Sequence, residues 1–133
     1  MADTPKIFRI MLEVGDLEKA IAFYSELLGI KGRPLRGSRA YFDCGSVILA
    51  VVDPTPGGLK PKPNVTDVYF SVKDIKSVHA RAVKLKCLSK EKVHDQNASD
   101  LIVRPWGELS FYAVDPWDNG LCFVDQKTEF TGK

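Results

Sequence analysis

The stretch VGDLEKAIAFYSELLG, residues 14–29, decides how the chain folds. Asp16 is a favourable helix N-cap, and apolar residues recur behind it at helical spacing as far as Gly29, which suits a helix C-terminus. Residues 7–14 alternate between apolar and other side chains, as a half-buried strand does. The stretch therefore predicts a strand, a tight turn and an amphipathic helix of about three turns.

The same pattern returns 58 residues later, where Asp74 repeats Asp16 as a helix cap. The apolar positions of the preceding strand repeat at this offset as well. The segment 53–64, rich in Pro and Gly, cannot hold a helix or a central strand and separates the two halves. Each half ends in strand-like runs: residues 40–44 and 47–52 around Gly45-Ser46, then residues 109–114 and 121–124. We interpret the chain as an internal duplication of a β-α-β-β-β unit.

The composition excludes several classes of protein. The chain has 133 residues, 44% hydrophobic and 27% charged, with a net charge of +2, so disorder and coiled coil are not expected. So small a charge predicts no nucleic-acid or membrane partner. No secretory signal is evident, and the apolar run 47–52 is too short to span a bilayer. Three cysteines without CxxC spacing suit free thiols in a reducing compartment, so we expect a cytoplasmic protein.

The repeated pattern resembles the vicinal oxygen chelate superfamily, which includes glyoxalase I, extradiol dioxygenases and bleomycin-binding resistance proteins. Residues 14–29 resemble its first-module signature, and Arg104-Pro-Trp-Gly-Glu108 with Asp115-Pro-Trp-Asp-Asn119 resembles its last-hairpin signature. The resemblance implies an α+β fold in which two paired βαβββ modules form a curved mixed sheet cup. We expect residues 1–133 to form a single such domain, with module one at about 7–53, a linker at about 54–65 and module two at about 66–126. The resemblance also implies a homodimer, in which modules can be exchanged.

Metal-dependent members of that superfamily hold a divalent ion with four side chains on cup-facing strands, usually His or Gln and Glu. The equivalent positions here are Arg9, Leu49 (or Ala50), Asp67 and Cys122. Arginine carries a permanent positive charge and leucine has no donor atom. One carboxylate and one thiol are a poor ligand set for the usual divalent ions. We therefore predict no metal and no other cofactor, and no catalytic residue is identified.

The same positions predict a ligand site in the cup. Strand alternation places side chains two residues apart on one face, and position 9 faces the cup in the relatives. Arg9 and Asp67 either replace the ion as a polar pair that meets a ligand, or simply neutralise each other. Trp106 resembles an aromatic that lines the cleft of bleomycin-binding relatives, and the alternative is that it packs a loop onto the sheet. The predicted ligand-binding residues are Arg9, Met11, Glu13, Leu49, Asp67, Tyr69, Trp106 and Cys122.

These residues support a metal-independent small-molecule-binding protein of the glyoxalase/bleomycin-resistance type, sequestering a drug or metabolite. The mixed charges suit a zwitterionic, anionic or aromatic ligand better than a cationic drug. The alternative is an enzyme of the same superfamily, a lyase, isomerase or dioxygenase with an atypical metal site. A third hypothesis, a pure interaction module, applies if the cup is filled by the protein's own side chains.

Overall fold

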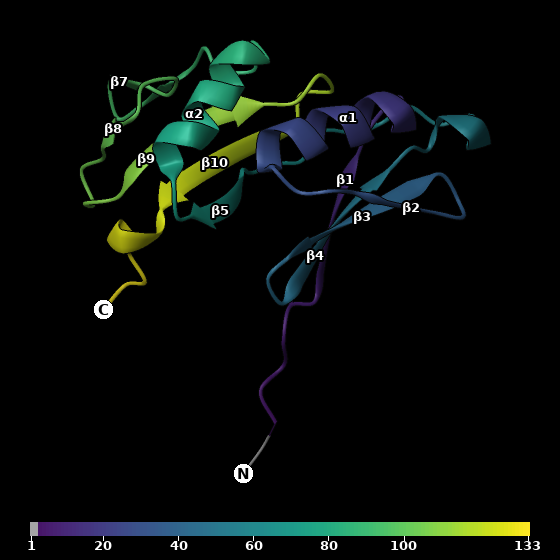
Figure 1. The fold of residues 1–133 in the computed structure, drawn as a ribbon, viewed down its shortest axis with the longest axis horizontal. Coiled ribbons are helices and arrows are strands. Elements are labelled where there is room, and N and C mark those ends of the chain that lie inside the picture. The colour runs from purple at the N-terminus through teal and green to yellow at the C-terminus, as the bar shows by residue number, and fades with distance from the viewer. Residues whose placement is uncertain (1–2) are drawn as a thin grey trace. The chain divides into compact units, whose positions relative to one another are not determined.

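The computed structural model describes residues 3–133, and the chain divides after Lys62 into two compact units. Strand β1 of the first unit runs parallel to β4, and the sheet order is β1-β4-β3-β2 (Figure 1). Helix α1 packs against β3 and β4. The elements of this unit are β1 (Arg9–Glu13), α1 (Leu17–Leu28), β2 (Arg33–Leu35), β3 (Arg39–Cys44), β4 (Val47–Val52) and a 3-10 turn (Thr55–Gly57).

The ends of α1 are set by the residues that the sequence singles out. The carboxylate of Asp16 accepts a hydrogen bond from the backbone N–H of Lys19 at 3.0 Å, which satisfies a free donor of the first turn. Gly29 adopts the left-handed conformation, with φ of 69°, and its N–H closes the last turn. The apolar stripe of the helix faces the sheet, where the ring of Tyr24 lies 6.0 Å from that of Phe42.

The turn Gly45-Ser46 fixes the register of the first unit's sheet. Because the loop has two residues, Cys44 pairs with Val47, and Tyr41 consequently lies opposite Ala50. Successive residues of β3 and β4 therefore alternate between the face of the sheet that packs on α1 and the opposite face, which we call the open face.

The second unit repeats this plan with a longer connection. Its sheet has the order β5-β10-β9-β8, with β5 parallel to β10. Asp74 caps α2 by accepting from the backbone N–H of Ser77. Under α2, the rings of Phe70, Phe123 and Phe111 stack in succession at 5.0 and 5.2 Å. The elements are β5 (Val68–Val72), α2 (Ile75–Lys84), β6 (Lys92–Val93), β7 (Gln96–Asn97), β8 (Ile102–Val103), β9 (Leu109–Val114), β10 (Gly120–Asp125) and a 3-10 turn (Gln126–Thr128).

The predicted α+β fold of two paired βαβββ modules is confirmed. Two details differ from the sequence-based expectation. The Pro/Gly segment contains one short 3-10 turn, and the small strands β6 and β7 lie between α2 and β8. Within residues 3–133, no helix has the length and apolar character to cross a membrane.

Candidate ligand-binding site

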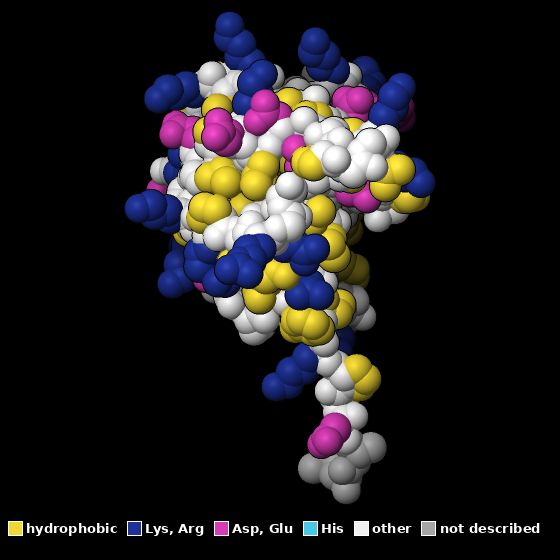
Figure 2. Space-filling view, turned by 90° about the vertical axis from the view of Figure 1, so that its right-hand side faces the viewer, with side chains coloured by type: hydrophobic (Ala, Val, Ile, Leu, Met, Phe, Trp, Pro, Cys, Tyr) yellow, Lys and Arg dark blue, Asp and Glu magenta, His cyan; other side chains and the backbone are white. Residues whose placement is uncertain are grey.

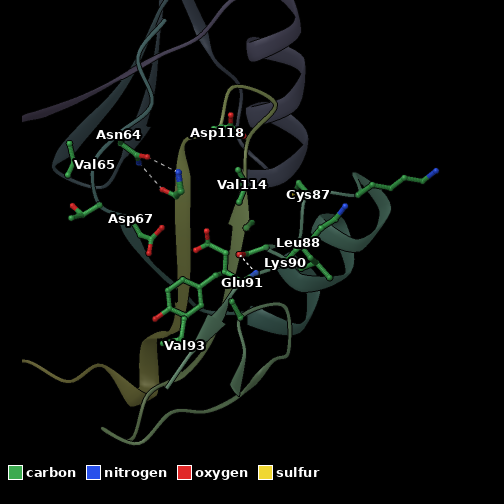
Figure 3. Close-up of a pocket in the computed structure, with 17 residues that line it drawn as sticks. Asn64, Val65, Asp67, Cys87, Leu88, Lys90, Glu91, Val93, Val114 and Asp118 are labelled. Carbon is green, nitrogen blue, oxygen red and sulfur yellow. Dashed lines mark hydrogen bonds between the residues drawn. The ribbon is translucent and has the colours of Figure 1, made fainter. Parts of the chain in front are cut away.

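A cavity of about 600 Å³ lies in the second unit, beside the residue that precedes β5. Asp67 and the three residues before it form one side, and residues 86–91, which follow α2, form the other (Figure 3). Tyr112 of β9 and Gly120 of β10 contribute to its lining, together with the apolar side chains of Val93 and Ala98. The cavity is therefore bounded by three parts of the chain that are distant in sequence.

Two carboxylates meet in this cavity. The side chains of Asp67 and Glu91 point toward one another from opposite sides (Figure 3). Partial burial raises the pKa of Asp67 above its ordinary value, and the negative charge of Glu91 raises it further. A ligand group that carries N–H donors or positive charge would relieve this repulsion.

Asp67 lies directly against the backbone of β10. Gly120 stands opposite it, and a Cβ at position 120 would overlap a carboxylate oxygen of Asp67. The Asn64 side chain brackets the glycine backbone, donating to its C=O at 2.9 Å and accepting from its N–H at 2.8 Å. Asn119 in turn accepts from the Asn64 backbone N–H at 2.9 Å and donates to Asp115 at 2.7 Å. The predicted turn 115–119 thus anchors this wall, whereas Asn64 was missed because nothing local in the sequence marks it.

Backbone hydrogen bonds hold the opposite wall of the cavity, residues 86–98, against β9. Ala98 N–H donates to Glu91 C=O at 2.9 Å, and Ala98 C=O accepts from Tyr112 N–H at 2.8 Å. Ala98 packs against Tyr112, Cys122 and Val124, so this part of the open sheet face is covered by the chain itself. The resulting wall is fixed to the sheet and not a free loop.

Arg104 links residues 97–100 of this wall to Ser110 of β9. It is 2% exposed, and its guanidinium group donates to the carbonyls of Asn97, Ala98 and Asp100 and to both oxygens of Ser110. Its Cζ lies 5.3 Å from the centre of the Tyr112 ring. The Arg104 guanidinium is therefore satisfied by oxygen atoms of the protein itself.

The other predicted residues of the second unit, Tyr69, Trp106 and Cys122, are not part of the cavity lining. Cys122 shares the sheet face of Tyr69 but is fully buried, and burial raises the pKa of its thiol to about 12. Tyr69 is half exposed, and its hydroxyl lies 3.4 Å from that of Tyr112. Trp106 donates to Glu108 at 2.7 Å and contacts the ring of His94 at 5.4 Å. Trp106 therefore packs its turn against the β6–β7 hairpin.

In the first unit, the expectation for Leu49 is wrong. The register of β1 and β4 places Leu49 beside Ile10, and the residue is 2% exposed on the face toward α1. Ala50, which pairs with Met11, takes the place on the open face. Arg9, Met11 and Glu13 share that open face, as strand alternation requires.

The residues at the positions of the family's metal ligands do not fit a divalent ion. The Arg9 guanidinium donates to the Tyr41 hydroxyl at 3.0 Å, and Leu49 faces α1. The Cys122 thiol resists ionisation because it is buried. Within residues 3–133, no three His, Cys, Asp or Glu side chains come together as a set of metal ligands.

The two units define a protein with paired βαβββ modules and a small-molecule-sized cavity. Residues 6–123 match the model of the Glyoxalase/Bleomycin resistance protein/Dioxygenase superfamily, and the chain belongs to this superfamily. This confirms the resemblance to the vicinal oxygen chelate proteins. The comparison with curated proteins gave no match.

Three similar solved structures illustrate the range of the fold. A glyoxalase/bleomycin resistance protein from Albidiferax ferrireducens T118 is 20% identical with a TM-score of 0.74, covering 90% of this chain and 98% of the other. A lactoylglutathione lyase from Agrobacterium tumefaciens is 22% identical with a TM-score of 0.63, covering 95% and 97%. TioX from Micromonospora sp. ML1 is 18% identical with a TM-score of 0.63, covering 92% and 99%. At these identities the likeness concerns the fold alone.

Proposed function

We propose that the chain is a metal-independent small-molecule-binding protein of the glyoxalase/bleomycin-resistance type that sequesters a drug or metabolite. The observation that carries the proposal is the cavity at Asp67, which combines two facing carboxylates with an apolar wall. Its volume of about 600 Å³ lies within the usual range for small-molecule sites. The lining also includes Lys86, Lys90 and Asp118, so charged groups of both signs would orient a ligand while Val93, Ala98 and Tyr112 bury its apolar part.

The cavity favours a ligand that presents a positively charged or donor-rich group to Asp67 and Glu91. Such a group would donate hydrogen bonds to two carboxylates. Charge-assisted hydrogen bonds of this kind are stronger than those between neutral groups. The planar ring of Tyr112 and the side chain of Val93 would meet the apolar part of the ligand. The expectation based on sequence, which disfavoured cationic ligands, did not include Glu91. A homodimer located in the cytoplasm remains part of the proposal.

The experiment measures the melting shift caused by benzamidine, a planar cation, against benzamide, its neutral analogue. We expect benzamidine to raise the melting temperature, and the shift to fall in Asp67→Asn and Glu91→Gln. Asp95→Asn is the matched control, because Asp95 is exposed at the β6–β7 turn and outside the cavity lining. Equal shifts from benzamide and benzamidine, or an unchanged shift in both cavity variants, would contradict the proposed site.

A second measurement separates the binding protein from the enzyme alternative. The purified chain is analysed for metal and melted with EDTA and with Mg²⁺, Mn²⁺, Ni²⁺ or Zn²⁺. The proposal predicts no stoichiometric metal and no metal-dependent melting shift. Bound metal with such a shift, or chemical conversion of a bound compound, would favour the enzyme.

A further inference from the structure

We infer that the open face of the first unit's sheet holds a binding subsite for the carboxylate or phosphate group of an aromatic ligand, formed by Arg9, Arg39 and Tyr41. Arg9, Arg33 and Arg39 lie around the Tyr41 phenol on this face, and within residues 3–133 only Arg33 is paired with a carboxylate. This subsite rests on first-unit residues alone, so it stands or falls independently of the cavity at Asp67.

The register of the sheet brings these side chains together. Tyr41 of β3 lies opposite Ala50 of β4, which in turn lies opposite Met11 of β1. Because Ala50 is small and fully buried, the Arg9 side chain can reach across β4 to donate to the Tyr41 hydroxyl at 3.0 Å. Arg39 precedes Tyr41 by two residues on the same strand and therefore lies on the same face.

The charge on this face is only partly compensated. Arg33 is paired with Asp43 through two hydrogen bonds of 3.0 and 2.8 Å. Across residues 3–133, neither Arg9 nor Arg39 has a carboxylate within 4.0 Å. Glu13, the other acid of this face, accepts the backbone N–H of Lys62 at 2.8 Å. Two guanidinium groups therefore keep donors for an added anion.

Arg39 carries the most specific sign of a missing acceptor. Its Nε is buried, and in the described part of the chain it donates no hydrogen bond. A buried donor without an acceptor is costly, so a turn of the Arg39 side chain that brings this N–H to a ligand oxygen would be stabilising. A hydrogen bond from Arg39, and then the positive charges of Arg9 and Arg39, lower the pKa of the Tyr41 phenol.

The surroundings favour an anion attached to an aromatic group. The Arg9 Cζ lies 5.0 Å from the Phe8 ring centre and 5.8 Å from that of Tyr41, and Arg33 lies 5.9 Å from the Tyr41 ring. These stacked contacts hold the guanidiniums in place before a ligand arrives. Phe8 and Met11 are 61% and 51% exposed, so apolar surface adjoins the charges. Such mixing is general on the face shown in Figure 2, where Lys and Arg side chains are interspersed with hydrophobic ones.

The test titrates the full chain with benzoate, phenyl phosphate, inorganic phosphate and benzyl alcohol, following backbone amide NMR signals and binding heat. We expect both aromatic anions to shift signals of β1 and β3, and benzyl alcohol to have no effect. Phenyl phosphate should bind more tightly than inorganic phosphate, and equal affinity would overturn the aromatic part of the inference. Shifts confined to the residues around Asp67 would overturn the subsite.

Variants assign the binding to the named arginines. Arg9→Gln and Arg39→Gln should each weaken benzoate binding about tenfold, since each removes a charged donor. Arg9→Lys should restore part of the affinity, because it keeps the charge without the planar fork. Arg36→Gln is the matched control, because Arg36 is exposed in the turn between β2 and β3. An equal loss in Arg36→Gln would show nonspecific charge attraction and refute the inference, and well-dispersed amide spectra exclude misfolding.

Discussion

Arg104 is the residue whose replacement tests the second unit most severely. The change Arg104→Ala removes a buried guanidinium that donates to the carbonyls of Asn97, Ala98, Asp100 and Ser110. These carbonyls belong to two segments, β9 and the chain before β8, which the arginine joins. We expect the protein to fold but to lose a large part of its stability.

The magnitude follows from which acceptors keep a partner. Ala98 C=O still accepts from Tyr112 N–H, and Asn97 C=O still accepts from Asp100 N–H. Asp100 C=O, whose contact with the arginine is the shortest at 2.7 Å, loses a strong partner. One such loss costs about 1–3 kcal/mol, and deleting a large buried side chain brings the total to about 3–4 kcal/mol. With about 2.1 cal/mol/K of unfolding entropy per residue, the melting temperature should fall by about 10–14 °C.

Calorimetry and amide hydrogen exchange measure the effect. The melting temperature should fall as calculated, and amides of residues 97–100 should lose protection more than those of the first unit. Arg104→Lys should lose less, because it retains the charge, and Arg36→Ala should change little because that side chain is exposed. A melting temperature for Arg104→Ala within about 3 °C of the parent would refute the anchoring role.

Three further predictions concern titration. The pKa of Asp67 is raised in the folded state, so its ionisation disfavours folding as the pH rises above 3.8, the ordinary pKa of an aspartate. Asp67→Asn should therefore raise the melting temperature at pH 7 more than at pH 4. A larger gain at pH 4, measured by calorimetry, would contradict this. The Cys122 thiol, with a pKa of about 12, should react with iodoacetamide at pH 8 at least about a hundredfold more slowly in the folded protein than in urea, and mass spectrometry that finds equal rates would argue against its burial. The pKa of Tyr41 should lie below the ordinary tyrosine value of 10.0 and that of Tyr112 above it. Ultraviolet titration of Tyr41→Phe and Tyr112→Phe assigns the two ionisations, and the reverse order would contradict the prediction.

The sequence predicts the repeated architecture well because its signals are local. Asp16 and Asp74 cap their helices as expected, and the two-residue turn Gly45-Ser46 forms the expected hairpin. Each signal depends on a few adjacent residues and the backbone they favour. Only the pairing of the strands depends on residues far apart in the sequence, and the repeat of the pattern in both halves indicated this pairing.

The site was less predictable because it depends on contacts between distant segments. Leu49 and Ala50 are both apolar, so no pattern in the run 47–52 shows which of them faces α1; the parallel pairing with β1 decides it. Glu91 meets Asp67 only because residues 86–98 lie along β9, and no short-range periodicity announces this course. Asp67 was a candidate because of its position in the repeat, whereas its acidic neighbour Glu91 lies in a segment without a sequence signal.

The close approach of Gly120 to Asp67 has a consequence for how this chain could diverge. Any side chain at position 120 would displace the carboxylate, whereas a glycine or alanine at position 67 would remove the obstacle. Among homologous sequences, these two positions should therefore change together: glycine at 120 where an acid stands at 67, and larger residues at 120 only where position 67 is small. Coupled substitution at positions 67 and 120 would distinguish relatives that retain an acidic ligand site from relatives that have lost it.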